Sequence, residues 1–328
     1  MSDHVLVTGA SGFLGYHIVN AAIEKGLIVY AAVRKNSNIK HLEDLPVRYV
    51  YLDYENVEDL AKQLRENNIR HIIHAAGITK AMRQDTYDYI NATFTLNLAK
   101  AAEKLGDQFS KFVFISSLAA VGPLTDPAKQ ILETDTPKPV TAYGRSKLLA
   151  EKNLSGVGIS SVILRPTAIY GPRDKDIFIL VKTVNKGFDP YIGKFDQFLS
   201  FVHAKDVAEL SVQSLFIPEA SGIYNVTDGN SYNRYQFSDI IKTILKKTAF
   251  RFHIPMPIVR TLAFVLETTN GWLKKPSVLS REKLHELAAK NWICDISKAK
   301  NELRYSPKFD LRTGLEDSIA WYTKNKWM

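Results

Sequence analysis

Short apolar runs alternate with longer amphipathic segments over the first half of the chain. Each apolar run has the length and side chains of a buried strand, and each amphipathic segment has apolar residues at helical spacing. The predicted strands are His4–Thr8, Leu27–Val33, Val47–Leu52, Arg70–Ala75, Lys111–Ser116 and Ser160–Leu164. The predicted helices are Phe13–Glu24, Val57–Asn67, Thr86–Leu105 and Tyr143–Leu154. Such alternation predicts an α/β fold, in which right-handed βαβ units wind on both faces of a parallel sheet.

Glycines spaced three apart follow the first strand and open the first helix, in the segment Thr8-Gly9-Ala10-Ser11-Gly12-Phe13-Leu14-Gly15. The first glycine permits a tight turn, the second leaves room for a pyrophosphate, and the third lets helix and strand pack closely. The helix N-terminus offers unpaired N–H groups and a positive dipole end to the phosphates. Because the triplet lies between a strand and a helix, it predicts a Rossmann dinucleotide site.

The strand–helix alternation weakens after about residue 172. We therefore expect residues 1–172 to form the Rossmann dinucleotide-binding domain, with parts of 200–230 returning to it. Residues 173–328 are expected to form mainly a smaller C-terminal substrate-binding lobe. The length of 328 residues suits one large α/β domain that carries such a lobe.

The formal net charge of +9 raises the question of an anionic partner. Lysines and arginines are scattered, so we interpret them as a solvated basic surface and expect no nucleic-acid partner. The single cysteine, Cys294, cannot form an internal disulfide, and no basic-then-apolar leader opens the chain. We expect a cytoplasmic protein without a membrane span, since the most apolar stretch, Ile254–Trp272, contains Arg260 and Glu267.

Tyr143 and Lys147 lie four residues apart on a predicted helix and therefore share one face. A free tyrosine titrates at about pH 10, which is too high for acid–base work at neutral pH. A neighbouring ammonium group, together with the positive nicotinamide of an oxidised cofactor, favours the phenolate. The pair predicts proton transfer by Tyr143, tuned by Lys147. The preceding strand ends in Ser116 and Ser117, which can place a hydroxyl beside the tyrosine.

These motifs together resemble the extended short-chain dehydrogenase/reductase family, and the resemblance covers essentially the whole chain. It is carried by the glycine segment, by Tyr143 with Lys147, and by Ser116-Ser117-Leu118-Ala119-Ala120-Val121-Gly122, which matches the family's Ser-Ser-x-x-x-x-Gly. The resemblance implies hydride transfer without a metal. It assigns the catalytic roles to Ser117, Tyr143 and Lys147, with Ser116 as the fallback for the hydroxyl.

The resemblance also implies a set of cofactor contacts. Asp53 would accept a hydrogen bond from the adenine amino group, with a helix cap or loop acid as the alternative. Asn91 would help to order the site, with a helix-surface amide as the alternative. The backbone around Pro166 and Ile169 would face the nicotinamide carboxamide. The expected set is Gly9, Ser11, Gly12, Phe13, Leu14, Gly15, Arg34, Asp53, Tyr54, Ala75, Ala76, Gly77, Asn91, Tyr143, Lys147, Pro166 and Ile169.

Arg34 stands at the end of the second strand, where a fold that prefers NAD usually has an acidic residue for the ribose 2′-OH. A guanidinium there can pair with the 2′-phosphate of NADP, and Lys35 adds positive charge. The alternative is that Arg34 stacks on adenine and discriminates nothing. We expect NADP as the cofactor, with NAD as the second choice.

Leu199 stands where nucleotide-sugar enzymes of the family carry an Arg that contacts the diphosphate. The apolar segment Ile254–Leu266 resembles the dihydroflavonol reductase and 3β-hydroxysteroid dehydrogenase branch and would wall an apolar pocket. Core packing and a membrane-surface helix are alternatives for that segment. We predict an NAD(P)-dependent reductase or dehydrogenase acting on a carbonyl or secondary alcohol of a fairly apolar small molecule. The alternatives for the function are a nucleotide-sugar epimerase and a non-catalytic NAD(P)-sensing protein. Whether the protein forms a homodimer is left open.

Overall fold

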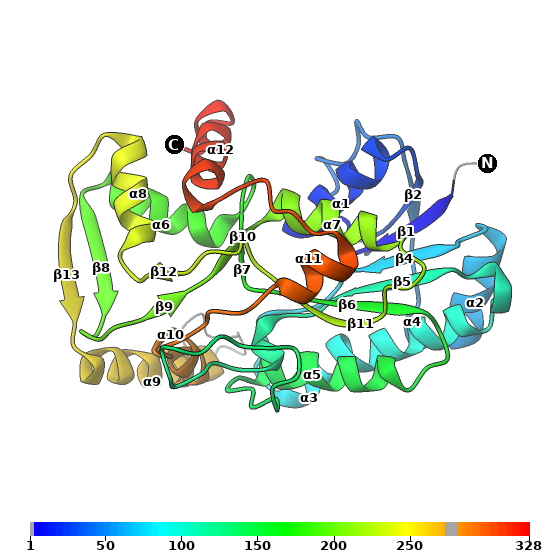
Figure 1. Ribbon diagram of the computed structural model, residues 1–328, viewed down its shortest axis with the longest axis horizontal. Helices are drawn as coiled ribbons and strands as arrows, with labels where there is room; N and C mark the ends of the chain where they lie inside the picture. Colours follow the sequence, from blue (N-terminus) through cyan, green and yellow to red (C-terminus); the bar gives the residue numbers. More distant parts are fainter. Residues whose placement is uncertain (1–2, 273–280) are drawn as a thin grey trace.

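The computed structural model describes residues 3–272 and 281–328, and a seven-stranded sheet forms its larger part (Figure 1). Its strands are β1 (His4–Thr8), β2 (Ile28–Ala32), β3 (Val47–Val50), β4 (His71–His74), β5 (Lys111–Ile115), β6 (Ser161–Pro166) and β11 (Gly222–Val226). Their order across the sheet is β11-β6-β5-β4-β1-β2-β3, and all neighbours are parallel. The predicted parallel α/β sheet is confirmed.

Alternate residues of each central strand face two separate apolar layers. Val5 and Val7 of β1 belong to one layer, whereas Leu6 belongs to the other. The first layer includes α1 (Phe13–Glu24) and α7 (Ala204–Ser214); the second includes α2 (Val57–Glu66), α4 (Phe94–Glu103) and α5 (Ala142–Ser155). Because both faces of the sheet are buried, its strands are continuous apolar runs, which made them recognisable in the sequence.

The predicted boundaries of these elements lie within two residues of the observed ones, with one exception. The prediction of one continuous α-helix over Thr86–Leu105 is wrong. The structure has α3 (Gln84–Tyr87), then a π-helical turn over Asp88–Thr93, then α4. The amide of Asn91, inside that turn, is bonded to both backbone groups of Ile78, so the helix is wider where this side chain is held.

The remaining elements form a smaller lobe beyond the end of β6, where the chain continues into β7 (Figure 1). Its strands are β7 (Ala168–Tyr170), β8 (Phe188–Ile192), β9 (Phe198–Leu199), β10 (Phe201–His203), β12 (Tyr232–Asn233) and β13 (Phe250–Ile254). Its helices are α6 (Lys175–Asn185), α8 (Gln236–Leu245), α9 (Met256–Trp272), α10 (Arg281–Leu287) and α12 (Leu311–Lys324). Helix α11 (Ser297–Leu303) instead packs on the seven-stranded sheet, where Ala299 and Leu303 join the first apolar layer. Short 3₁₀ turns lie at Gly106–Gln108 and Leu118–Ala120. Within 3–272 and 281–328, no helix is long and apolar enough to cross a membrane.

Buried histidines make the fold sensitive to acid. Burial lowers the pKa of His74 and that of His203 from 6.5 to about 3, with nearby lysine charges adding to the effect. Below pH 6.5 the unfolded chain therefore binds more protons than the folded one, and stability falls as the pH falls. We expect the free energy of unfolding to drop between pH 7 and pH 5, by up to about 1.4 kcal/mol per pH unit for each such group.

Denaturant titration at these two pH values measures the drop. His203→Gln should flatten the pH dependence, since residue 203 is fully buried in the wild type. His285→Gln, at an exposed position, serves as the matched control and should leave the dependence unchanged. Equal stability at pH 7 and pH 5 would contradict the prediction.

Candidate active site

The glycine turn between β1 and α1 is packed so closely against neighbouring backbone that a side chain does not fit at Gly9 or Gly15. Gly9 has a φ of +68°, and a Cβ atom there would lie 2.8 Å from the backbone of Ala75 and Ala76. A Cβ atom on Gly15 would lie 2.0 Å from the Gly9 carbonyl oxygen. Gly12 is the N-cap of α1 and provides no side-chain cap, so the first amides of the helix stay available to an anion. The backbone of this turn and the N-terminus of α1 would thus accommodate a pyrophosphate.

His74, at the end of β4, fixes the floor beside the glycine turn. Its ring bonds to Thr8 Oγ1 at 2.7 Å and to Thr95 Oγ1 at 3.0 Å. Thr8 Oγ1 in turn accepts a hydrogen bond from the Ala76 amide at 3.1 Å. His74 is 1% exposed and, with its low pKa, neutral. It is a packed structural residue that holds the Ala75–Ala76 backbone in place.

Asn91 connects the end of β4 to the helix that carries the tyrosine. Its side chain accepts from the Ile78 amide at 2.8 Å and donates to the Ile78 carbonyl and to Ser146 Oγ. A Cβ atom on Gly77 would lie 3.0 Å from Asn91 Oδ1 and 3.5 Å from Lys147 Nζ. A side chain at Gly77 would therefore crowd Asn91, and the glycine lets the backbone lie close to both polar groups.

Ser117, Tyr143 and Lys147 meet at the carboxyl end of β5. Lys147 Nζ donates to the Ile115 carbonyl at 2.8 Å, which anchors the ammonium group beside the strand end. Ser117 caps the following 3₁₀ turn through its hydroxyl, which accepts from the Ala119 amide at 3.2 Å, and its side chain also interacts with the Tyr143 phenol. Ser116 is instead buried and donates to Glu151, so the fallback hydroxyl faces away from the phenol and toward the protein interior.

The pKa values of this site differ from those of free side chains. Burial lowers the pKa of Lys147 to about 8, an effect that the nearby Glu151 carboxylate opposes. Burial raises the pKa of Tyr143 to about 12, and the interaction with Ser117 opposes that rise. Lys147 is thus still mostly protonated at neutral pH. The protein groups alone hold Tyr143 in its protonated form, as a proton donor for a reduction requires.

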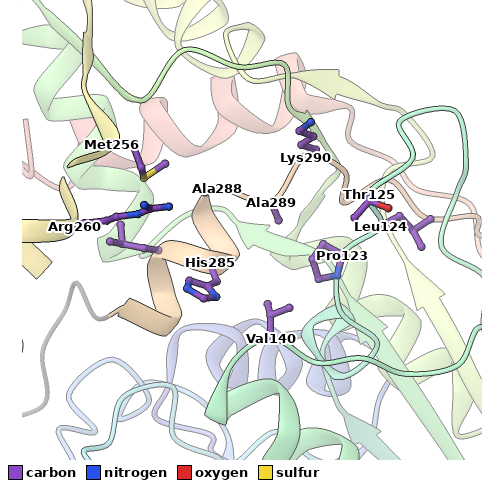
Figure 2. A pocket seen from close by; sticks show the side chains of 11 residues that line it. Pro123, Leu124, Thr125, Val140, Met256, Arg260, His285, Ala288, Ala289 and Lys290 are labelled. Atoms are coloured by element: carbon purple, nitrogen blue, oxygen red, sulfur yellow. The ribbon is translucent and has the colours of Figure 1, made fainter. Parts of the chain in front are cut away.

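A cavity of about 400 Å³ lies beside the N-terminal end of α5 (Figure 2). Pro123, Leu124 and Val140 line it from the sheet side, and residues of α9 and α10 line it from the lobe. Glu282 of α10 accepts from the Ala142 amide at 2.6 Å, which fixes α10 against the start of the tyrosine-bearing helix. The cavity has the size of a small-molecule site. Val140 in its lining lies three residues before Tyr143, and Ser117, Tyr143 and Lys147 are not themselves among the described lining residues.

Comparison with known proteins identifies the family. The sequence profile of the NAD dependent epimerase/dehydratase family matches residues 5–227. The chain belongs to this family. The predicted enzyme of the extended short-chain dehydrogenase/reductase type is thereby confirmed, as is its use of a nicotinamide dinucleotide.

Relatives of this epimerase/dehydratase family member have different activities. This chain is 26% identical to a decarboxylating sterol-4-alpha-carboxylate 3-dehydrogenase of Schizosaccharomyces pombe, over 99% of this chain and 98% of that protein. It is 28% identical to a UDP-glucose 4-epimerase of Vibrio cholerae, over 78% of this chain and 80% of that protein. The crystal structure of dTDP-glucose 4,6-dehydratase of Bacillus anthracis in complex with NAD superposes with a TM-score of 0.78 at 20% identity, covering 99% of this chain and 98% of that one. That structural match establishes the fold alone.

The other predicted cofactor residues of this family member lie around the glycine turn. Arg34 is exposed just beyond β2, and no hydrogen bond of its side chain to the described residues is present. Asp53 is exposed and accepts a hydrogen bond from the Glu55 amide at 3.0 Å, as a loop acid does. Tyr54 stacks on Phe94 with ring centroids 5.0 Å apart. Leu199 lies in β9, paired with Tyr232, and is not among the residues that line the cavity.

Two groups of residues escaped the sequence analysis. One is the buried pair of Arg165 and Glu151 beneath Lys147, with Nη2 and Oε2 2.6 Å apart. The other is the set of basic residues that line the cavity, which come from separate segments of the second half of the chain. Both depend on contacts between distant segments, which no local spacing reveals. The spacing of Glu151, one helical turn after Lys147, was the only signal available.

Proposed function

We propose that this protein is an NAD(P)-dependent oxidoreductase that interconverts a carbonyl and a secondary alcohol on a fairly apolar small molecule. The nicotinamide supplies or accepts the hydride. In the direction of reduction, Tyr143 donates its proton to the substrate oxygen, and Ser117 positions that oxygen. Lys147, held by the Ile115 carbonyl, retains N–H groups to bind the ribose and a positive charge to favour the phenolate after transfer.

The observation that carries this proposal is the meeting of Ser117, Tyr143 and Lys147 at the carboxyl end of β5. A largely apolar cavity reaches Val140, three residues before Tyr143. The lobe formed mainly by residues 173–328 is proposed to bind the substrate, because α9 and α10 supply one wall of that cavity. A cytoplasmic location is proposed because Cys294, the single cysteine, is buried and has no partner for an internal disulfide.

NADP is proposed as the preferred cofactor, on the strength of the exposed Arg34 just beyond β2. An Arg34→Ala variant should weaken NADPH binding by about 1.5–3 kcal/mol more than NADH binding, because only NADPH carries the 2′-phosphate. Titration of each cofactor with the purified protein measures the difference. Arg65→Ala, an exposed arginine of α2, is the control and should change neither affinity. Equal losses would support adenine stacking, and a wild-type preference for NADH would overturn the proposal.

A nucleotide-sugar epimerase is the second candidate, favoured by the V. cholerae relative and by the basic residues of the cavity. The two candidates differ in the ligands that stabilise the folded protein. We expect NADP(H) to raise the melting temperature, an apolar steroid, flavonoid or aryl ketone to raise it further, and UDP or dTDP to leave it unchanged. A screen for NADPH or NADH consumption against carbonyl compounds completes the test. A shift of several degrees with UDP and none with any ketone would favour the epimerase.

A further inference from the structure

The polar side chains of the cavity are almost all basic. Its lining includes Arg260 of α9, His285 of α10 and Lys290, and Thr125 is the one other lining residue with a polar side chain among those described. All three basic residues are exposed. Within the described part of the chain, none of their side chains forms a hydrogen bond or an ion pair. An anion that enters the cavity would therefore meet two cations, Arg260 and Lys290, that have no competing partner among the described residues.

The acidic residues of α10, Glu282 and Glu286, are bonded to other protein groups. Glu282 of α10 accepts from the Ala142 amide and from the Arg145 guanidinium, the latter at 2.7 Å. Glu286 accepts from Lys283 at 2.6 Å. These contacts occupy both carboxylates of α10, and the cavity lining contains no acidic residue among those described. The cavity consequently keeps an uncompensated positive character.

The rest of the lining is apolar. Leu124, Val140, Met256 and Leu284 contribute to it, together with prolyl and alanyl side chains. Burial of an apolar ligand there gains about 25 cal/mol per Å². A nucleobase would find only Thr125 and the His285 imidazole as hydrogen-bonding side chains besides Arg260 and Lys290 among the described lining residues, too few to satisfy its polar edge. The lining therefore suits a ligand with an apolar body and a single anionic group better than a nucleoside diphosphate.

We propose that this cavity takes an amphipathic substrate, namely an apolar alcohol or ketone that bears a carboxylate or phosphate, with Arg260 as its principal counter-ion. Figure 2 shows the Arg260 side chain reaching from α9 toward the segment that carries His285 and Ala288. A guanidinium can hold either anion through two parallel hydrogen bonds, and Arg260 is the one lining residue with that geometry. The inference rests on the proposed function for the reacting carbon, whereas the anion site can be tested without turnover.

The experiment measures binding to the NADPH-saturated protein by calorimetric titration. The probes are octanoate, octyl phosphate, octanol and UDP, so that the two anions share one apolar chain with a neutral alcohol. We expect octanoate and octyl phosphate to bind about tenfold more tightly than octanol. Arg260→Gln should remove that advantage and leave octanol binding unchanged. Arg312→Gln, an exposed arginine of α12, is the matched control and should leave all affinities unchanged.

Each other outcome overturns the proposal. Octanol binding as tightly as octanoate would show that the basic residues do not select anions. An Arg260→Gln loss no larger than that of Arg312→Gln would show that Arg260 is not the counter-ion. UDP binding more tightly than octyl phosphate would assign the basic group to a nucleotide. Failure of the carbonyl screen with retained octanoate selectivity would instead reject the oxidoreductase and keep the anion site, so the two failures are distinguishable.

Discussion

A Tyr143→Phe variant is expected to lose at least about a hundredfold in turnover, the usual size of a general acid–base contribution. The phenyl ring keeps the packing against Tyr87, whose ring centroid lies 6.5 Å away, so the fold of the site should not change. Only the hydroxyl that interacts with Ser117 is lost. Because Lys147 and the glycine turn are untouched, NADPH affinity should stay close to that of the wild type. Steady-state kinetics and a cofactor titration measure the two quantities.

The matched control for this variant is Tyr89→Phe. Tyr89 is an exposed tyrosine of the π-helical turn, and its hydroxyl bonds to Glu55. Its removal should leave turnover within a few-fold of the wild type. Near-normal turnover in Tyr143→Phe would show that another group donates the proton. A large fall in NADPH affinity would instead assign Tyr143 to cofactor binding.

The predictable parts of this protein are those in which the chemistry is local in sequence. The glycine turn could be predicted because its three glycines, the strand before them and the helix after them are contiguous. Tyr143 and Lys147 could be predicted because a spacing of four places them on one helical face. Two serines at a strand end, in contrast, left two candidates for the hydroxyl. In the structure Ser116 is bonded to buried Glu151 while Ser117 interacts with Tyr143, and these contacts favour Ser117 in the proposed role.

What could not be predicted depends on distant segments. The π-helical turn around Asn91 arises where that side chain reaches the Ile78 backbone, and nothing in the helix sequence itself signals it. The basic group of the cavity combines α9, α10 and the residues after them, so Arg260 looked like a mere interruption of an apolar stretch. The apolar stretch itself is amphipathic in the fold, with Val259 and Ala263 buried and Ile258 and Leu262 exposed. Which face of this helix is buried depends on the segments that pack against it, and the sequence of the helix alone does not specify them.

The buried pair of Glu151 and Arg165 is expected to be one of the most sensitive positions for stability. Glu151 is 2% and Arg165 1% exposed, and the guanidinium bonds both carboxylate oxygens, at 2.9 Å and 2.6 Å. Glu151→Ala would leave the arginine charge buried without its partner, because Arg165 is held in β6 and cannot reach water. We expect the free energy of unfolding to fall by about 3–5 kcal/mol. Urea denaturation of the purified variant measures it.

Two further variants separate the loss of a partner from the general cost of a mutation. Glu58→Ala removes one side of the exposed pair with Lys104, whose charged atoms lie 2.7 Å apart, and should cost less than about 1 kcal/mol. The double variant Glu151→Met, Arg165→Met removes both buried charges and should recover most of the loss, since two apolar side chains need no hydrogen-bond partners. If Glu151→Ala fails to fold, recovery of soluble, folded double variant tests the same prediction. A loss below about 1 kcal/mol for Glu151→Ala, or a double variant no more stable than the single one, would show that the uncompensated charge of Arg165 is not what the fold must avoid.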